Sequence, residues 1–418
     1  MEDAEFDDIL DDWFIESLKT YKDLHVYQLE HPTRVIEWTS AKKEIKPDSD
    51  NAKVILKKKK NPTVAFQTLQ ISVVISVCVA GYSPSKNEIL ELRLPLKLFA
   101  DENKGLCAER DFKVAHGGFT DGSVRCLKHI PGTRCVVTND GLSCDLQVWD
   151  LGGDDSDVIR RTGSIEGRKG VSEGGSRIAA RLSSPPQVLH GAQSSDVQLT
   201  QLTSGQTLYK LDTDSAAPLS SLQFVSDAVF LAGCRNGSVV IADTRTSAAP
   251  QVSPPPEDGV AWWTDVSAGP HLSTCRVVRL SSSGQAVVSD LRNPGGAVCR
   301  AQLDVQTRRC SLDDVGVSWA PALDDCIAVS GFSGVVQIYN TSVWRTEQQE
   351  AQPLFQHRGH AVSSQQPDDG VPVFVTAHVW HPERPRTLLS AASDGSIHVW
   401  DWVHPAGSAA EGPTPGTK

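Results

Sequence analysis

The part of the sequence that most constrains the fold lies near the C-terminus, where residues 376–402 read as three short antiparallel strands. Ser393-Asp394-Gly395 separates the second strand from the third, and Asp and Gly accept the positive φ that a tight hairpin turn requires. The third strand ends in Trp400-Asp401, and Gly359-His360 lies upstream. A sheet this small must bury both faces against copies of itself, so the pattern predicts one blade of a β-propeller.

Six earlier segments repeat this strand pattern. Their third strands are expected to end at Leu94, Asp150, Thr200, Asp243, Asp290 and Asn340. Successive endings lie roughly 40 to 60 residues apart, at or above the usual propeller repeat of about 40–45. The sequence therefore predicts an all-β chain with seven blades. Six blades are the alternative, because the first and third blades match the pattern least well.

The fourth strands are harder to place than the first three. Residues 24–29 are expected to complete the last blade, because pairing both ends of the propeller in one sheet leaves no open edge. We assign strands at 112–115, 208–211 and 299–303 to the blades that follow them, blades two, four and six. Residues 152–175 and 250–258 are expected to be loops.

The N-terminal segment predicts a short acidic amphipathic helix. Its apolar side chains recur at helical spacing: Phe6, Ile9, Leu10, Trp13, Phe14 and Leu18. The helix either packs on the propeller and seals its edge or docks in an apolar, basic-rimmed groove of a partner protein. For the second case the candidate partner-binding residues are Asp11, Asp12, Trp13 and Phe14.

We divide the chain into an arm of residues 1–23, a single propeller of residues 24–403 and a disordered tail of residues 404–418. A lysine-rich insertion, residues 41–75, interrupts the first blade and is expected to be a mobile surface segment. It carries the run Lys57–Lys60, through which direct binding to microtubules or RNA is an alternative function. The net charge of −11 disfavours broad binding to nucleic acid or membranes through a basic face.

No sequence motif predicts a catalytic, cofactor or metal site. The nucleophile elbow, the phosphate-binding loop and the dinucleotide-binding glycine pattern are all absent from the sequence. His378 and His381 would point to opposite faces of a strand, and His357 and His360 flank a turn, so neither pair is expected to hold a metal. The 10 cysteines form no Cys-x-x-Cys pair, and the acidic start is not a secretory signal, so we expect reduced thiols. An enzyme using the centre of the propeller stays a minor alternative.

The chain as a whole resembles a divergent branch of the WD-repeat family. The resemblance rests on combinations such as Asp11-Asp-Trp-Phe14, Thr33-Arg-Val-Ile-Glu-Trp38 and His357-Arg-Gly-His360. Further matching segments are 87–92, 109–119, 127–134, 146–149, 157–159, 188–192, 330–332, 384–390 and 398–403. The resemblance covers most of the chain. This sequence departs from the family pattern at about residues 41–75.

The family's repeat pattern assigns a structural role to residues of the last blade. Ser390, Asp394 and Trp400 match the pattern, in which Trp packs between sheets and Asp accepts hydrogen bonds from a loop histidine. His360 is the matching histidine, but residues 361–373 separate it from the first strand, which argues against its membership. Further structural repeat residues are Trp149, Asp150, Asp243, Asp290 and Asp401.

The resemblance also implies a function, that of a non-enzymatic protein-binding scaffold without a cofactor. Such a protein would work in the cytoplasm and at spindle poles, with a nuclear fraction as the alternative, and would support microtubule organisation and cell survival. The implied partners are microtubule-associated proteins and the RNA-endonuclease subunits of Integrator, which are assembled together with a scaffold protein. We expect a monomer within such a hetero-complex, with no membrane contact.

Overall fold

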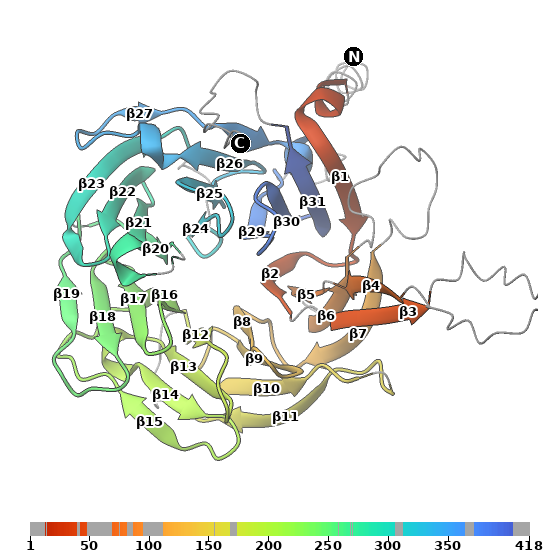
Figure 1. Cartoon of the computed structure of the whole chain (residues 1–418), viewed down its shortest axis with the longest axis horizontal. Coiled ribbons are helices and arrows are strands. Elements are labelled where there is room, and N and C mark those ends of the chain that lie inside the picture. Colours follow the sequence, from red (N-terminus) through yellow and green to blue (C-terminus); the bar gives the residue numbers. More distant parts are fainter. Residues whose placement is uncertain are drawn as a thin grey trace, which may run out of the picture.

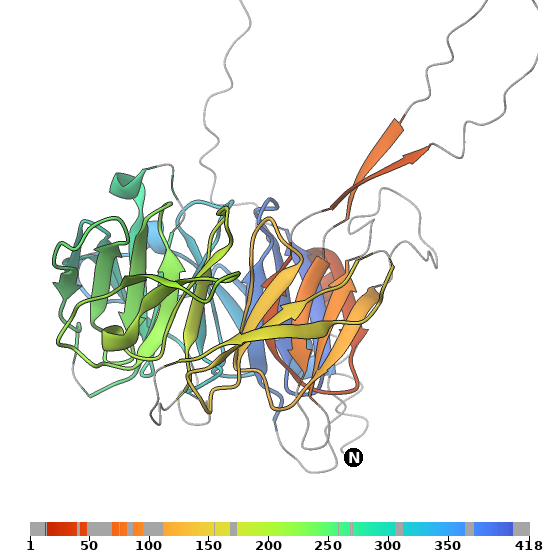
Figure 2. The same cartoon turned by 90° about the horizontal axis from the view of Figure 1, so that it is seen from below.

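The chain forms a ring of seven β-sheets, which confirms the predicted seven-bladed, all-β propeller (Figure 1). The computed structural model describes residues 13, 15–39, 42–47, 69–74, 76–81, 87–94, 112–153, 155–167, 174–257, 259–267, 269, 271–305, 312–363 and 372–403. Side-on, the blades stand next to one another as a thick disc (Figure 2). Among the described residues, no helix has the length and hydropathy needed to cross a bilayer.

Blades one to four each contain four antiparallel strands. Blade one consists of β2 (Thr33–Trp38), β5 (Ser76–Gly81), β6 (Asn87–Arg93) and β7 (Lys113–Thr120). Blade two consists of β8 (Cys126–His129), β9 (Cys135–Asn139), β10 (Leu146–Asp150) and β11 (Arg160–Ile165). Blade three consists of β12 (Arg177–Ala180), β13 (Gln187–Gly191), β14 (Gln198–Gln201) and β15 (Thr207–Lys210). Blade four consists of β16 (Leu219–Phe224), β17 (Val229–Cys234), β18 (Val239–Asp243) and β19 (Gln251–Ser253).

Blades five to seven follow the same plan, with one additional short strand. Blade five consists of β20 (Trp262–Val266), β21 (Arg276–Ser281), β22 (Gln285–Asp290) and β23 (Asn293–Leu303), with β27 (Glu350–Ala351) added in parallel to β23. Blade six consists of β24 (Gly316–Trp319), β25 (Cys326–Ser330), β26 (Val336–Asn340) and β28 (Phe355–His357). Blade seven consists of β29 (Val375–Trp380), β30 (Thr387–Ala392), β31 (Ser396–Trp402) and β1 (Tyr21–Gln28). The short helices are η2 (Ser194–Asp196), η3 (Leu272–Thr274), η4 (Thr341–Val343) and α2 (Gly359–Ser363).

Blade seven closes the ring with strands from both ends of the propeller, as the sequence predicts. β1 pairs antiparallel with β31, in a register that places Leu24 opposite Trp400 and Gln28 opposite Ser396. On its other side β31 pairs with β30, with Leu389 opposite Val399. The turn between β30 and β31 contains Gly395 with a φ of +86°, a conformation that glycine adopts without strain.

The sequence assignment of the fourth strands was wrong for three blades. The strands expected at 112–115, 208–211 and 299–303 lie in β7, β15 and β23, which pair with β6, β14 and β22 of the preceding blades one, three and five. A strand that directly follows the third strand reaches its free edge through a hairpin connection, so it completes the same blade. The segments 152–175 and 250–258, which were expected to be loops, contain β11 and β19.

The ends of the lysine-rich insertion form a two-stranded ribbon of β3 (Lys42–Pro47) and β4 (Leu69–Val74) that projects from the disc (Figure 2). The run Lys57–Lys60 and the tail 404–418 lie outside the described residues. At the N-terminal end, residues 15–20 are helical and β1 begins directly afterwards at Tyr21. The arm therefore joins the ring at the strand that closes it.

The core is divided into clusters between neighbouring blades. The cluster between blades six and seven holds Trp400 and Trp402, each 1% exposed, against Val336 and Ile338 of β26. It also includes Tyr21, so the first residue of β1 is part of the core that joins the last two blades.

Candidate functional site

The seam of blade seven, where β1 meets β31, is the strongest candidate for a functional site. Two hollows and a cluster of buried histidines adjoin this seam. The backbone N–H of Val403 donates to the carbonyl oxygen of Thr20 at 2.8 Å, which fixes the end of the arm helix to the end of β31. The arm, the seam and the hollows therefore form one continuous part of the molecule.

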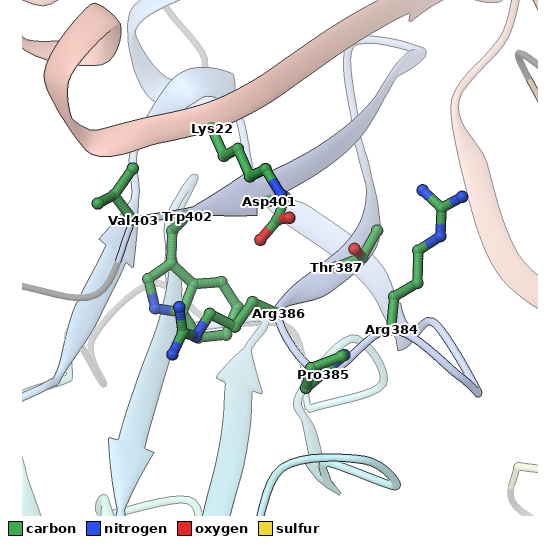
Figure 3. Close-up of a pocket in the computed structure, with 8 residues that line it drawn as sticks. All are labelled: Lys22, Arg384, Pro385, Arg386, Thr387, Asp401, Trp402 and Val403. Atoms are coloured by element: carbon green, nitrogen blue, oxygen red, sulfur yellow. The ribbon is translucent and has the colours of Figure 1, made fainter. Parts of the chain in front are cut away.

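The first hollow is a pocket of about 440 Å³ at the end of β31 (Figure 3). Lys22 of β1 and Arg384 and Arg386 of the connection between β29 and β30 supply positive charge to its lining. Asp401 contributes a carboxylate, and Trp402 supplies an aromatic wall. Burial raises the pKa of Asp401 against the opposing effect of these three cations.

Two polar atoms in the lining of this pocket lack a hydrogen-bond partner among the described residues. They are the hydroxyl of Thr387 and the indole N–H of Trp402, and both side chains are buried. Buried polar groups are nearly always hydrogen-bonded, so a ligand group or water that reaches them would be stabilised there. With three cations and one carboxylate, the pocket is suited to an acidic side chain that also carries apolar surface.

The second hollow, of about 390 Å³, lies between the arm and the outer strand of blade six. Trp13, Glu16 and Tyr21 line one side, and residues 352–356 and 358 line the other. Trp13 is half-buried there, so this predicted partner-binding residue faces the rim of the propeller. Asp11, Asp12 and Phe14 lie outside the described residues.

The arm also leaves apolar side chains exposed to solvent. Leu18, which was expected on the apolar stripe, is 71% exposed, and Ile15 is 55% exposed. Because these positions are three residues apart on a helix, they share one face. Ile15 was missed in the sequence analysis, since it falls outside the stripe defined by Trp13, Phe14 and Leu18.

The predicted repeat residues of blade seven form a continuous hydrogen-bond chain. The indole N–H of Trp400 donates to Oγ of Ser390 at 3.1 Å, and Ser390 Oγ lies 2.8 Å from Nε2 of His360. Nδ1 of His360 lies 2.7 Å from Oγ of Ser396, whose hydroxyl donates to Asp394 at 2.6 Å. His360 thus belongs to the network, contrary to the sequence argument, because α2, which contains it, lies against β31 of blade seven. Ser396, which links His360 to Asp394, was not foreseen.

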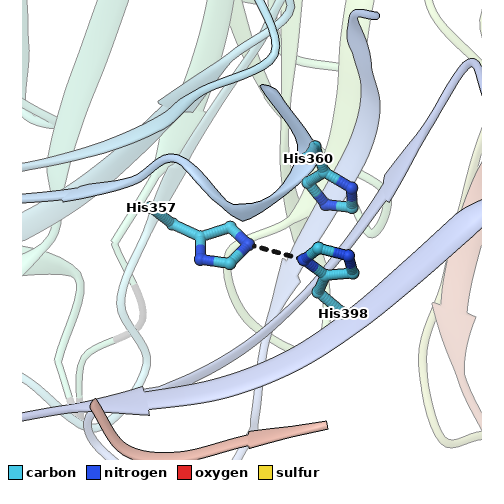
Figure 4. A group of neighbouring side chains, drawn as sticks. All are labelled: His357, His360 and His398. Atoms are coloured by element: carbon cyan, nitrogen blue, oxygen red, sulfur yellow. Dashed lines mark hydrogen bonds between the residues drawn. The ribbon is translucent and has the colours of Figure 1, made fainter. Parts of the chain in front are cut away.

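Two further buried histidines adjoin this chain (Figure 4). Nε2 of His357 lies 3.0 Å from Nδ1 of His398, and Nδ1 of His357 lies 2.7 Å from the hydroxyl of Tyr21. The rings of His360 and His398 are stacked with centroids 3.8 Å apart. Burial lowers the pKa of all three imidazoles, that of His360 to about 3, so they are neutral near pH 7.

The three histidines are close enough together to raise the question of a metal site, since one nitrogen of each lies within 4.8 Å of the others. A metal ligand must turn a free lone pair toward the ion. Both nitrogens of His357 and both of His360 already take part in hydrogen bonds, and the stacked rings of His360 and His398 direct their in-plane lone pairs along parallel planes. The cluster is therefore a structural hydrogen-bond network that ties Tyr21 of β1 to blades six and seven.

The repeat residues of the other blades have comparable local roles. The indole N–H of Trp149, 5% exposed, donates to the hydroxyl of Thr138 at 2.9 Å, as Trp400 does to Ser390. Asp150, Asp243 and Asp290 end their third strands and accept the backbone N–H two residues later. For Asp243 and Asp290, hydrogen bonds from the following arginine side chain lower the pKa to about 2. These aspartates stabilise turns and do not gather at one site.

Comparison with known proteins gives a consistent result over nearly the whole chain. The chain is 47% identical over 397 residues to "Integrator complex assembly factor WDR73" of Danio rerio, covering 94% of this chain and 96% of that protein. It is 38% identical over 403 residues to the protein of the same name from Homo sapiens, covering 94% and 97%. The Mus musculus protein of that name is 39% identical over 402 residues, covering 95% and 98%. No family model matches the chain.

Proposed function

Because the chain belongs to the WDR73 family of WD-repeat propellers, we propose that it is a non-enzymatic assembly factor that brings protein subunits of the Integrator complex together. The observation that carries this proposal is the match to proteins named as Integrator assembly factors along about 94% of the chain. A rigid ring with an arm fixed to its closing strand suits such a role, since a scaffold must present several surfaces in a constant arrangement.

Within this function we assign the arm to partner binding. Trp13 and Tyr21 face the ring, whereas Ile15 and Leu18 are directed to solvent on an anchored helix. A short apolar helix face of this kind fits a groove of a partner protein. The neighbouring pocket with Lys22, Arg384 and Arg386 would receive an acidic side chain of the same partner.

The test is quantitative co-purification of Integrator subunits with the tagged full-length chain and with its variant Leu18→Asp. Burying a leucine side chain stabilises a complex by about 1.5–3 kcal/mol, so the variant should bind the subunits about 10- to 150-fold more weakly. The matched control is Leu182→Asp, because Leu182 is 73% exposed, close to the 71% of Leu18, and lies between β12 and β13.

Two outcomes would contradict these proposals in different ways. If the unaltered chain retains no Integrator subunit, the assembly role is rejected. If the subunits bind equally well to the Leu18→Asp and Leu182→Asp variants, the assembly role stands but the arm is not the docking element. Matched melting curves for all chains ensure that a loss of binding does not reflect unfolding.

We also propose, on the family resemblance, that the protein works in the cytoplasm and at spindle poles with microtubule-associated partners. Imaging of the tagged chain through cell division tests this location. Direct binding to microtubules or RNA through the insertion 41–75 remains the alternative. It predicts a steep salt dependence that is lost when those residues are deleted.

A further inference from the structure

Four charged side chains from four different blades meet at the centre of one side of the ring. This side, which we call the entry face, is the one on which the innermost strands begin. Antiparallel pairing places the turns between second and third strands on the same side. Arg125 directly precedes β8, and Arg177 is the first residue of β12. Arg235 lies in the turn between β17 and β18, and Asp313 lies in the connection that leads to β24.

Asp313 of blade six holds two of these arginines through different carboxylate oxygens. Nη1 of Arg125 donates to Oδ2 at 2.5 Å, and Nη2 of Arg235 donates to Oδ1 at 3.1 Å. Although burial alone would raise the pKa of Asp313, these two hydrogen bonds keep it below its ordinary value. Blade six therefore places an ionised carboxylate between an arginine of blade two and an arginine of blade four.

The surrounding structure holds these two arginines in place. The backbone N–H of Arg125 donates to the carbonyl oxygen of Asn139, and Gly141 lies so close that an added Cβ would be 2.3 Å from Cγ of Arg125. The guanidinium of Arg235 lies 6.0 Å from the ring centroid of Trp263. A pre-positioned guanidinium loses little conformational entropy when it binds an anion.

Arg177 is the third arginine, and it has no ion-pair partner in the part of the chain that the structure describes. Among the described residues its side chain makes one hydrogen bond, a long one of 3.5 Å from Nε to the carbonyl oxygen of Leu219. Burial lowers the pKa of Arg177, and the like charges of Arg235 and Arg125 lower it further, whereas the thiol of Cys126 and the carboxylate of Asp313 act in the opposite direction. A partly buried cation beside two like charges gains energy from an anion that comes within reach.

The charges of this group do not balance. Three guanidinium groups and one carboxylate leave an excess of two positive charges, whereas the chain as a whole carries −11. A phosphate monoester carries about −1.5 to −2 charges near pH 7 and offers three acceptor oxygens. Its oxygens match the paired donors of arginine, as a carboxylate does. We propose that Arg125, Arg177 and Arg235 form a phosphate-binding site on the entry face, which Asp313 occupies until a phosphate group displaces its carboxylate.

Phosphate binding explains this cluster of charges better than a purely structural role of its two ion pairs does. The side chains of Arg125, Asp313 and Arg235 are 33%, 39% and 24% exposed, so water screens the two ion pairs. Ion pairs of this kind contribute little to folding stability. They also leave Arg177 without a directly paired carboxylate among the described residues, so the charge of Asp313 acts on it only at longer range, whereas a bound phosphate would contact it.

The first test is calorimetric titration of the full chain with sodium phosphate, with sodium chloride holding the ionic strength constant. Arg177→Gln should weaken phosphate binding by about tenfold, because a guanidinium–phosphate hydrogen bond is charge-assisted. Arg125→Gln serves as a second variant if Arg177→Gln does not fold. Asp313→Asn should tighten binding by about threefold or more, because it removes the competing carboxylate.

The matched control is Arg245→Gln. Arg245 is also paired with an aspartate, Asp243, but it follows the far end of β18, on the opposite side of the ring. Its substitution should leave phosphate binding unchanged. The proposal is overturned if the chain does not bind phosphate, if the folded arginine variants bind it as tightly as the control does, or if Asp313→Asn weakens binding.

A second titration identifies the source of the phosphate group. It uses a short peptide that contains phosphoserine and the same peptide with glutamate in that position. Tighter binding of the phosphopeptide than of inorganic phosphate would identify a phosphorylated protein as the ligand, and equal binding would identify free phosphate. If the glutamate peptide binds as tightly as the phosphopeptide, the site does not select phosphate and the proposal fails.

Discussion

Replacing Trp400 by alanine should be the most damaging single substitution in the seam. Its side chain is 1% exposed, and its ring stacks on His357 at 4.6 Å and lies 5.6 Å from Phe355. Burying a tryptophan removes about 150–250 Å² from water, which corresponds to about 4–6 kcal/mol at 25 cal/mol per Å². Alanine keeps part of this burial, while the cavity adds a cost, so we expect a loss of about 3–5 kcal/mol in the free energy of unfolding.

The measurement is guanidinium-induced unfolding followed by circular dichroism, with extrapolation to zero denaturant. Trp400→Phe is the matched control, because it keeps an aromatic ring in the core and removes the N–H that donates to Ser390 at 3.1 Å. It should cost about 1–2 kcal/mol for the lost hydrogen bond. A Trp400→Ala chain within about 1 kcal/mol of the unaltered protein would refute the assignment of this residue to the core between blades six and seven.

Three further predictions concern the same ring. Because the pKa of His360 is lowered to about 3 in the folded chain, from an ordinary 6.5, its neutral form stabilises the fold above pH 6.5. This stabilisation is lost as pH falls from 6.5 toward 3, so the guanidinium midpoint should be lower at pH 5 than at pH 7.5, and by a smaller amount in His360→Gln. Tyr21→Phe removes the hydroxyl that lies 2.7 Å from Nδ1 of His357 and should lower the free energy of unfolding by about 1–3 kcal/mol. Relative to the unaltered protein, amide hydrogen exchange should become faster in β1, and it should change less in β17. Gly331→Ala should lower the melting temperature, because Gly331 has a φ of +90° and an added Cβ would lie 2.2 Å from a backbone oxygen, whereas Gly153→Ala, with open space at Cβ, should have little effect.

The first three strands of most blades could be predicted because their side chains alternate and short turns bound them. β17, for example, is buried along nearly its whole length and precedes a turn with Asn236-Gly237. Some of the fourth strands gave no such signal. Residues 160–164 of β11 are all exposed, and β19 contains only three residues. These strands are held by backbone pairing to the third strand, which requires no apolar pattern.

Residues of the candidate sites could likewise be predicted only where they lie close together in the sequence. Ser390, Asp394 and Trp400 could be placed because they lie within one hairpin, and a hairpin fixes the distances between its own residues. The arginines at positions 125, 177 and 235 come from three blades and lie in no common sequence pattern. Only the curvature of the ring brings them together near Asp313, which pairs with two of them, so no local sequence pattern could reveal them.

Because β1 pairs with β31, the first strand of the propeller stays unpaired until nearly the whole chain has been synthesised. At about 5–20 residues per second, roughly 20–75 s pass on the ribosome between the synthesis of β1 and that of its partner strand. During this interval blades one to six can form one after another, while β1 has an unpaired edge that could add to a strand of another chain. A chain cut short before Ser396 would keep that edge permanently. Loss of the last blade would therefore release the arm as well, although the two lie at opposite ends of the propeller sequence.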